Sequence, residues 1–460
     1  MNATPPQPRP PAHAPGATID SILAAASDQA RDTLRVLGEL LGNEPSWNLS
    51  ATQFAARHIG VDPSSLASTR YVGPTTSLAV LGHLLRLEID RHADQVVIGS
   101  PGDGEPPTWS QLDLGPGVQL PVPGRLVAFF PAGTLAEPPL CISIDDRQWE
   151  RDFAILSPAP AKSVAEGLMT VFRNRMKSEL NPLRGRVLEA RVDDGAMRIG
   201  VTSELAADRS GLILPDSLWA EIDIFLAAAT SRRELLRTLG LGTNRGMLVA
   251  GPPGVGKTHL VRVIAAELAG DFTTILADAN SMRHAIADLY AESGNFGPTL
   301  VVLDDIDLVL GHRDGSGHNN SLADFLSALD GVRQRQDILT IATTNDPESL
   351  DPAAQRSSRF DTVITLPMPD ADLRARILER HLGQLSLGID YTAVAEALEG
   401  ASGADVKEVV RRAVLEHGGA FTQDQLLDIA ESGRWQTAVD RGRYLAPKSS
   451  RRKSRVGFGG

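Results

Sequence analysis

The fold of this chain is decided by residues 247–258, which read Met-Leu-Val-Ala-Gly-Pro-Pro-Gly-Val-Gly-Lys-Thr. The apolar run Met247–Ala250 predicts a short strand, and the residues after it match the spacing G-x-x-x-x-G-K-T of a phosphate loop. Three glycines in this loop allow the tight turn that points backbone N–H groups at phosphate oxygens. A helix predicted over Thr258–Ala269 adds the positive end of its dipole to the same anion site. The stretch therefore predicts a strand–loop–helix unit that binds a nucleoside triphosphate.

The phosphate loop offers several kinds of contact to a nucleotide. Lys257 supplies a point charge for the β- and γ-phosphates, and the hydroxyl of Thr258 can ligate Mg²⁺. A glycine-rich turn without a ligand is the alternative interpretation, which the complete motif disfavours. The residues predicted to bind the nucleotide here are Gly251, Pro252, Pro253, Gly254, Val255, Gly256, Lys257, Thr258 and His259.

A second element has the form of a Walker B segment. Residues 299–305 read Thr-Leu-Val-Val-Leu-Asp-Asp, an apolar strand that ends in two carboxylates. Asp304 is predicted to hold Mg²⁺ through water, and Asp305 to orient or deprotonate the attacking water. A core strand that ends in solvated acids is the alternative. The phosphate loop upstream favours the functional interpretation.

Composition and charge exclude several classes of protein. With 460 residues the chain has room for about two to four domains. A net charge of −12 argues against electrostatic binding to a nucleic-acid backbone as the main activity. The single cysteine, Cys141, permits no intrachain disulfide, fits a reducing compartment, and lies among apolar residues that favour a buried thiol. We find no bilayer-spanning apolar stretch and no signal peptide, so we expect a cytoplasmic protein without membrane contact.

Composition and periodicity divide the chain into five parts. Residues 1–16 are rich in proline and predict a disordered tail, and residues 446–460 predict a basic flexible tail. Residues 17–205 mix helical and strand patterns and predict an α+β domain, to which we assign partner recognition. Residues 206–370 alternate apolar strands with helical patterns, which is typical of an α/β layer fold. Residues 371–445 carry helical patterns alone and predict a small helical lid.

Five apolar runs are the predicted strands of the α/β part. They are Met247–Ala250, Thr273–Leu276, Leu300–Leu303, Leu339–Thr343 and Val363–Leu366. In the α+β part, residues 186–201 predict two strands around an Asp-Gly turn, and residues 77–91 and 163–180 have helical periodicity.

Several motifs between Leu214 and Asp440, about half of the chain, resemble those of the AAA+ ATPases in the right order, and those of the classical AAA branch in particular. Residues 329–331, Leu-Asp-Gly, resemble the element associated with communication between subunits. Residues 341–345, Ile-Ala-Thr-Thr-Asn, are similar to the sensor 1 strand. Residues 350–361 resemble the second region of homology, and residues 402–405, Ser-Gly-Ala-Asp, the start of the sensor 2 helix.

The resemblance implies roles for five further residues. Asn345 would hydrogen-bond the attacking water or the γ-phosphate. Arg356 and Arg359 would project into the nucleotide of a neighbouring subunit, where an arginine finger stabilises charge developing on the γ-phosphoryl oxygens. Gly403 and Ala404 would approach the adenine and ribose. For the two arginines, exposed positions in a surface loop are the alternative interpretation.

The resemblance also implies a fold class and a function. The fold would be a P-loop AAA+ module, with a parallel five-stranded sheet and flanking helices, followed by an all-helical lid and preceded by the α+β domain. The function would be that of an ATP hydrolase that binds ATP and Mg²⁺ and assembles into a homo-oligomeric ring, most often a hexamer. Such a ring would remodel a protein partner recruited by the N-terminal domain.

Two departures from the family pattern bear on the rate and the mode of action. Asp305 stands where the family has glutamate, and misplacing a catalytic group by ~1 Å can cost about 10²-fold in rate. Residues 278–286 lack the aromatic residue of the family's pore loop, and Tyr290 falls in a helical pattern where packing is its expected role. Both departures favour the alternative of a slow ATP-dependent regulatory switch. A nucleic-acid-dependent ATPase is a third hypothesis, which the acidic composition disfavours.

Overall fold

The computed structural model of the protein describes residues 48–102, 104–147, 151–193, 196–202, 207–310, 337–347, 360–385 and 388–435. The chain forms two compact units. Unit 1 takes the residues up to Glu204 together with Ala269–Leu276 and His284–Thr299, and unit 2 takes Leu205–Leu268, Ala277–Arg283 and the residues from Leu300 onward. Within these described ranges, no helix combines the length and the apolar character that crossing a bilayer demands.

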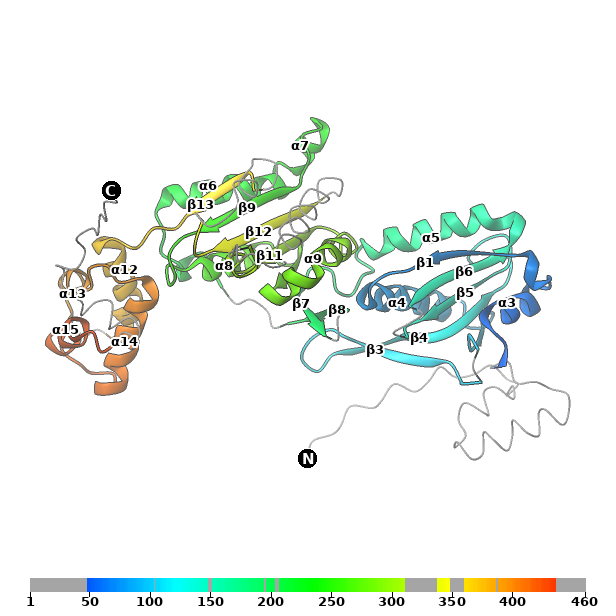
Figure 1. Ribbon diagram of the computed structural model, residues 1–460, viewed down its shortest axis with the longest axis horizontal. Helices are drawn as coiled ribbons and strands as arrows, with labels where there is room; N and C mark the ends of the chain where they lie inside the picture. The colour runs from blue at the N-terminus through cyan, green and yellow to red at the C-terminus, as the bar shows by residue number, and fades with distance from the viewer. Residues whose placement is uncertain are drawn as a thin grey trace, which may run out of the picture. The chain divides into compact units, whose positions relative to one another are not determined.

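Unit 1 contains a six-stranded sheet with antiparallel pairings. Its strands are β1 (Leu66–Tyr71), β2 (Val97–Gly99), β3 (Thr108–Asp113), β4 (Gln119–Phe130), β5 (Leu140–Asp145) and β6 (Asp152–Pro158). Their order is β1-β6-β5-β4-β2, and β3 also pairs with β4 (Figure 1). The predicted α+β character of this part of the chain is confirmed.

Helices cover both faces of this sheet because its central strands are apolar on both sides. On one face, α3 (Ala51–Ile59) packs Phe54 against Leu156 of β6. Side chains alternate along a strand, so Phe153 of the same strand points to the opposite face. There the ring of Phe172 in α5 (Lys162–Met176) lies 5.2 Å from that of Phe153, between centroids. Helix α4 (Thr75–Arg91) packs on β4, and α4 and α5 confirm the helical periodicity seen in the sequence.

A second sheet has seven strands in the order β13-β9-β12-β11-β10-β7-β8. They are β7 (Val187–Asp193), β8 (Ala196–Val201), β9 (Arg245–Ala250), β10 (Thr273–Ala277), β11 (Thr299–Leu303), β12 (Ile338–Thr344) and β13 (Thr362–Thr365). Strand β9 pairs in parallel with β12 and β13. The five predicted strands are confirmed, and their near-continuous apolar runs suit a sheet buried on both faces.

The sheet is mixed, and the expectation of five parallel strands was incomplete. The hairpin β7–β8, which is antiparallel, continues the strand order beyond β10. A backbone hydrogen bond of 2.9 Å from Thr274 N to Arg186 O joins the start of the hairpin to β10. The hairpin strands themselves are confirmed, whereas their place in the second sheet depends on pairing between distant parts of the chain.

The remaining helices surround the second sheet or form the C-terminal lid. They are α6 (Asp216–Ala229), α7 (Arg233–Thr238), α8 (Lys257–Glu267), α9 (Ala279–Ser293), α10 (Asp307–Leu310), α12 (Ala371–Leu382), α13 (Tyr391–Ala397), α14 (Gly403–His417) and α15 (Gln423–Ser432). Short 3₁₀ turns occur at η2 (Pro63–Ser65), η3 (Ala159–Ala161), η4 (Arg209–Gly211) and η5 (Gly383–Leu385). Helices α12 to α15 enclose their own apolar core, which includes Leu378, Val409 and Leu426. The predicted all-helical character of this part is confirmed.

Candidate functional site

The phosphate loop joins β9 to α8, and its glycines are required by its backbone. Gly251 has φ 154° and Gly254 has φ 83°, in the left-handed region that residues with a side chain rarely adopt. A Cβ atom on Gly251 would lie 2.5 Å from the carbonyl oxygen of Leu366, and one on Gly254 would overlap Ser402 Oγ. The sequence motif is therefore matched by a backbone that strongly favours glycine at these two positions.

Helix α8 begins at Lys257, directly after the loop. Its N-cap residue, Gly256, offers no side chain to the first turn, and the first turn contains no acidic residue. The N–H groups of this turn therefore have no capping side chain from within the helix. Together with the positive end of the helix dipole they form a site suited to phosphate oxygens.

The side chain of Lys257 is 6% exposed and makes three hydrogen bonds. Its Nζ atom donates to Gly251 O at 2.8 Å, to Pro252 O at 2.9 Å and to Asn345 Oδ1 at 2.7 Å. Burial lowers the pKa of Lys257, and the nearby carboxylates, Asp305 first among them, act in the opposite direction. The ammonium group is thus held at the base of the loop by acceptors that a phosphate group can replace.

Two carboxylates follow the end of β11. Asp304 Oδ2 accepts a hydrogen bond of 3.4 Å from Thr258 Oγ1, and Asp305 Oδ1 accepts one of 3.0 Å from Asn345 Nδ2. Burial raises the pKa of Asp305, and the neighbouring carboxylates of Asp304 and Asp307 raise it further. Asn345 therefore lies between the phosphate-loop lysine and the second carboxylate, and one hydrogen-bond chain links all three.

The oxygen atoms of Thr258 and Asp304 fit the ligand preferences of Mg²⁺. Mg²⁺ in nucleotide sites takes one or two protein oxygens and completes its shell with phosphate oxygens and water. Among the described residues, no cluster of three or more His, Cys, Asp or Glu side chains could hold a metal ion without a nucleotide. The donor set thus suits a metal that arrives with phosphate groups.

The lid contacts the phosphate loop through the start of α14. Ser402 caps this helix, with Ser402 Oγ accepting from Asp405 N at 3.3 Å and Asp405 Oδ2 accepting from Ser402 N at 2.8 Å, so the helix begins with a capping box. The N–H group of Ala404 donates to Gly254 O at 3.0 Å. Gly403 lies at the same contact, where a Cβ atom would be 3.5 Å from Gly254 O. The two residues expected near the adenine and ribose therefore lie against the phosphate loop.

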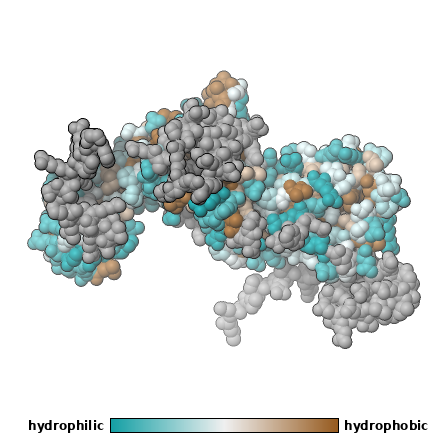
Figure 2. All heavy atoms as spheres, in the orientation of Figure 1, coloured by the Kyte–Doolittle hydropathy of each residue, from teal (hydrophilic) through white to brown (hydrophobic). Residues whose placement is uncertain are grey.

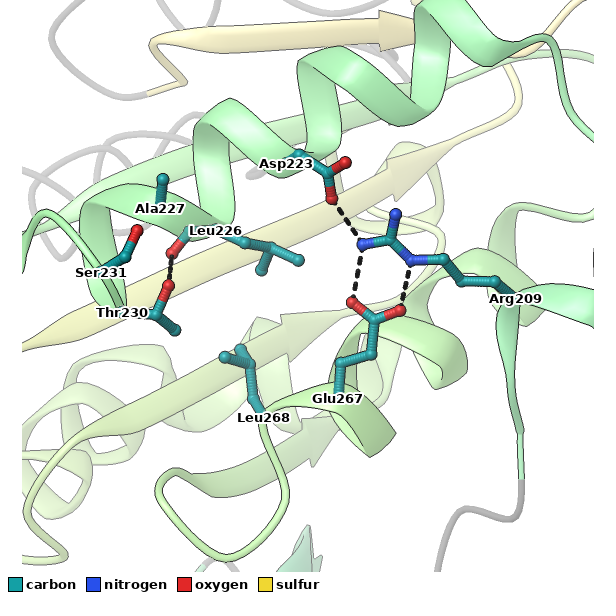
Figure 3. Close-up of a pocket in the computed structure, with 8 residues that line it drawn as sticks. All are labelled: Arg209, Asp223, Leu226, Ala227, Thr230, Ser231, Glu267 and Leu268. Atoms are coloured by element: carbon teal, nitrogen blue, oxygen red, sulfur yellow. Dashed lines mark hydrogen bonds and ion pairs between the residues drawn. The ribbon is translucent and has the colours of Figure 1, made fainter.

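A segment that sequence reasoning did not assign also borders the loop. Arg209 donates from Nε to Glu267 of α8 at 2.5 Å and from one terminal nitrogen to Asp223 of α6 at 2.5 Å (Figure 3). This arginine fixes the turn that carries Gly211 and Leu212 beside α8. A Cβ atom on Gly256 would lie 2.8 Å from Leu212 Cδ1, so this leucine packs directly on the phosphate loop. No motif marks it, because its role depends only on packing.

The other predicted loop residues differ in their exposure. Val255 is 9% exposed, Pro252 is half-buried and Pro253 is exposed. His259 is half-buried in α8, and its Nε2 atom would lie 2.7 Å from a Cβ atom on Gly211. Burial lowers the pKa of His259, and the nearby positive charges lower it further, whereas Asp208 acts in the opposite direction.

Several of the predicted site residues and segments lie outside the described residues. This holds for Arg356 and Arg359, for residues 329–331 and for both tails. The second region of homology is described only at its end, where Asp361 forms an ion pair with Arg245 at the start of β9.

Residues 278–286, which lack a pore-loop aromatic, lie mostly in the first part of α9. This helix contains one residue with non-helical angles, Ala285 (φ −142°, ψ 24°). Tyr290, further along the same helix, is 2% exposed, which confirms its predicted packing role.

The sheet, the loop and the paired carboxylates define a P-loop domain of the α/β class. Residues 247–368 match the family model described as "ATPase family associated with various cellular activities (AAA)". The chain thus carries a domain of the AAA ATPase family, as the motifs predicted.

Curated relatives are similar to part of the chain. The chain is 34% identical over 193 residues to the proteasome-activating nucleotidase of Pyrococcus horikoshii, which covers 39% of this chain and 48% of the relative. It is 35% identical over 224 residues to ATP-dependent zinc metalloprotease FtsH 3 of Sphaerobacter thermophilus, which covers 45% of this chain and 44% of the relative. It is 31% identical over 193 residues to the cell division cycle protein 48 homolog of Archaeoglobus fulgidus, which covers 40% of this chain and 26% of the relative. The chain spans about half the length of these relatives, or less.

Proposed function

We propose that the protein binds ATP with Mg²⁺, hydrolyses it, and uses the cycle to remodel a protein partner. The observation that carries the proposal is the hydrogen-bond chain from Lys257 through Asn345 to Asp305. It brings together a cation for the phosphates, an amide for orienting water and a carboxylate that can accept a proton.

The roles of the residues follow from their contacts. On ATP binding, Lys257 would exchange its carbonyl acceptors for β- and γ-phosphate oxygens, which are stronger partners because they are charged. Asn345 would orient the attacking water, and a carboxylate oxygen of Asp305 would take its proton. Thr258 and Asp304 would hold Mg²⁺, which neutralises charge on the phosphate oxygens. Gly403 and Ala404 would lie near the adenine and ribose, and the other loop residues, His259 included, would border the nucleotide.

We further propose that the active form is a homo-oligomeric ring, most often a hexamer in the family that the motifs resemble. In such a ring Arg356 and Arg359 would reach the nucleotide of the next subunit. An exposed apolar surface on and after α7 supports self-association: Leu235 is 53%, Leu239 59% and Leu241 67% exposed (Figure 2).

The domain roles remain part of the proposal. Residues 17–205 would recognise the protein partner, residues 206–370 would carry the ATPase site and residues 371–445 would act as its lid. Of the relatives, one is named for activating the proteasome and another for ATP-dependent proteolysis. We propose a protein partner and a cytoplasmic location for this chain. The net charge of −12 gives no support to a nucleic-acid partner.

A slow ATP-dependent switch is the second candidate function. The observation that favours it is Asp305, whose side chain is one methylene shorter than glutamate and whose pKa is raised by burial. Turnover far below ordinary motor rates, with tight ATP binding and ATP-dependent assembly, would support the switch.

Binding of a fluorescent ATP analogue, with and without Mg²⁺, tests the proposed site. We expect Lys257→Ala to weaken binding by about 100-fold or more, because it removes a charged contact to two phosphates. Lys162→Ala is the matched control, since Lys162 is an exposed lysine on α5 in unit 1. Equal binding by wild type and Lys257→Ala would refute the site.

A further inference from the structure

The turn that carries the two carboxylates is held by one buried threonine. Thr343 is fully buried near the end of β12. Its Oγ1 atom accepts from Asp305 N at 2.8 Å and donates to Asp304 Oδ1 at 2.5 Å. Its carbonyl oxygen accepts from Ile306 N at 2.9 Å. A single residue therefore binds three successive residues of the turn.

The turn needs such support because its backbone is unusual. Asp305 has φ 53°, the left-handed conformation that residues other than glycine seldom adopt. In the described part of the chain, Asp337 is the other non-glycine residue with positive φ, and its carboxylate is fixed by hydrogen bonds from Arg233, Arg237 and Thr243. Both positions thus follow the rule that an uncommon conformation persists where the surroundings determine it.

The two hydrogen bonds of the threonine hydroxyl have different consequences. The bond to Asp304 occupies Oδ1, and Oδ2 of the same carboxylate lies 3.4 Å from Thr258 Oγ1. The bond from Asp305 N fixes the start of the left-handed turn, and the Asp305 side chain then meets Asn345 Nδ2 at 3.0 Å. One hydroxyl group therefore orients both the carboxylate beside Thr258 and the carboxylate beside the Asn345 amide.

We propose that Thr343 is a positioning residue, which holds Asp304 toward the Mg²⁺–nucleotide complex and Asp305 toward the attacking water. The inference rests on the proposed ATPase function. It extends that function by naming a residue on which the geometry of both carboxylates depends. Thr343 touches no reacting atom, and its effect passes through the two carboxylates.

The test compares Thr343→Val with Thr343→Ser. Valine keeps the shape and removes both hydroxyl bonds, whereas serine restores the hydroxyl without the methyl group. Thr340→Val is the matched control, because Thr340 is a 3% exposed threonine three residues earlier on the same strand. Thr343→Ala supplies a second variant without the hydroxyl, should valine prevent folding as judged by circular dichroism.

Two readouts are needed. In steady-state ATP hydrolysis we expect Thr343→Val to lower kcat by about 10- to 100-fold, since misplacement by ~1 Å has an effect of this order, with any rise in KM no larger than the loss of Mg²⁺-dependent affinity. In nucleotide binding without Mg²⁺ we expect all variants to equal wild type. With Mg²⁺, the gain in affinity that wild type shows should shrink in Thr343→Val and return in Thr343→Ser.

The outcomes separate this inference from the function on which it rests. If wild type binds no nucleotide or hydrolyses none, the proposed function fails. If wild type is active and Thr343→Val matches it in both kcat and the Mg²⁺-dependent gain, the positioning role is refuted. An equal loss in Thr343→Ser or in Thr340→Val would also refute it, because the effect would then reflect general damage to the strand.

Discussion

A buried glutamate in unit 1 accepts a hydrogen bond from the first turn of a helix 215 positions away in the chain. Glu292 of α9 is fully buried, and its carboxylate lies at the N-terminus of α4. Its Oε1 atom accepts from Ser77 N at 3.2 Å, and Oε2 accepts from Ser77 Oγ. The N-cap residue of α4 is Pro74, which provides no capping side chain, and the first turn has no acidic residue. Glu292 therefore caps α4 from another helix.

Replacing Glu292 by alanine removes the acceptor for two buried donors. Each unsatisfied buried donor costs about 1–3 kcal/mol, so unit 1 should lose about 2–6 kcal/mol of unfolding free energy. Hydrogen–deuterium exchange of peptides that cover α4 reports this unit separately. At ~1.4 kcal/mol per tenfold, exchange that proceeds through the unfolded state of unit 1 should speed up by about thirtyfold to about 10⁴-fold.

Asp288→Ala is the control, because Asp288 is an exposed acid on the same helix and its loss should change stability by less than about 0.5 kcal/mol. Unchanged exchange in Glu292→Ala, or equal acceleration in both variants, would refute the capping argument.

The same residue predicts the sign of a pH dependence. Burial raises the pKa of Glu292, although hydrogen bonds from Ser77 and Asn295 act in the other direction. A raised pKa in the folded state means that folding favours the protonated form. The contribution of Glu292 to stability is then fully present below the unfolded pKa of about 4.3 and is lost as pH rises through the folded pKa. Relative to Glu292→Gln, wild type should become less stable as pH rises above the unfolded pKa, and an opposite slope would contradict the argument.

Three further predictions concern other parts of the chain. Gly254→Ala should disturb the lid contact and weaken nucleotide binding by about tenfold or more, because the positive φ of Gly254 disfavours alanine and the new methyl group overlaps Ser402 Oγ. Titration with a fluorescent nucleotide measures the loss of affinity. Asp337→Ala should destabilise unit 2 by about 1–3 kcal/mol in urea unfolding, because both ion-paired arginines of α7 lose their carboxylate. Cys141 should react with a thiol reagent only after unfolding, because it is fully buried and burial raises its pKa; rapid labelling of the native protein would contradict this.

The sequence predicted those parts of the fold that depend on local pattern. The backbone of the phosphate loop requires glycine at fixed positions, so the motif identified β9, the loop and α8 together. The helical lid and the capping box at Ser402 were also predictable, because hydrophobic period and cap residues are local signals.

The parts that were missed depend on contacts between residues far apart in the chain. The hairpin β7–β8 was recognised, yet its position next to β10 is decided by backbone pairing that leaves no mark in its own sequence. Glu292 and Ser77 are 215 positions apart, and a glutamate in a helical pattern is usually exposed. Thr343 lies within residues 341–345, which resemble the sensor 1 strand, but the sequence does not show which groups a buried threonine hydroxyl will hydrogen-bond.

Steady-state phosphate release from Mg²⁺–ATP, measured against protein concentration for wild type, Lys257→Ala and Arg356→Ala, tests whether the ATPase sites are shared between subunits. In a ring of shared sites, specific activity rises with concentration in wild type and both substitutions abolish it, while Arg356→Ala still binds nucleotide. Activity that is absent, or that depends on neither concentration nor Arg356, would contradict a ring of shared ATPase sites.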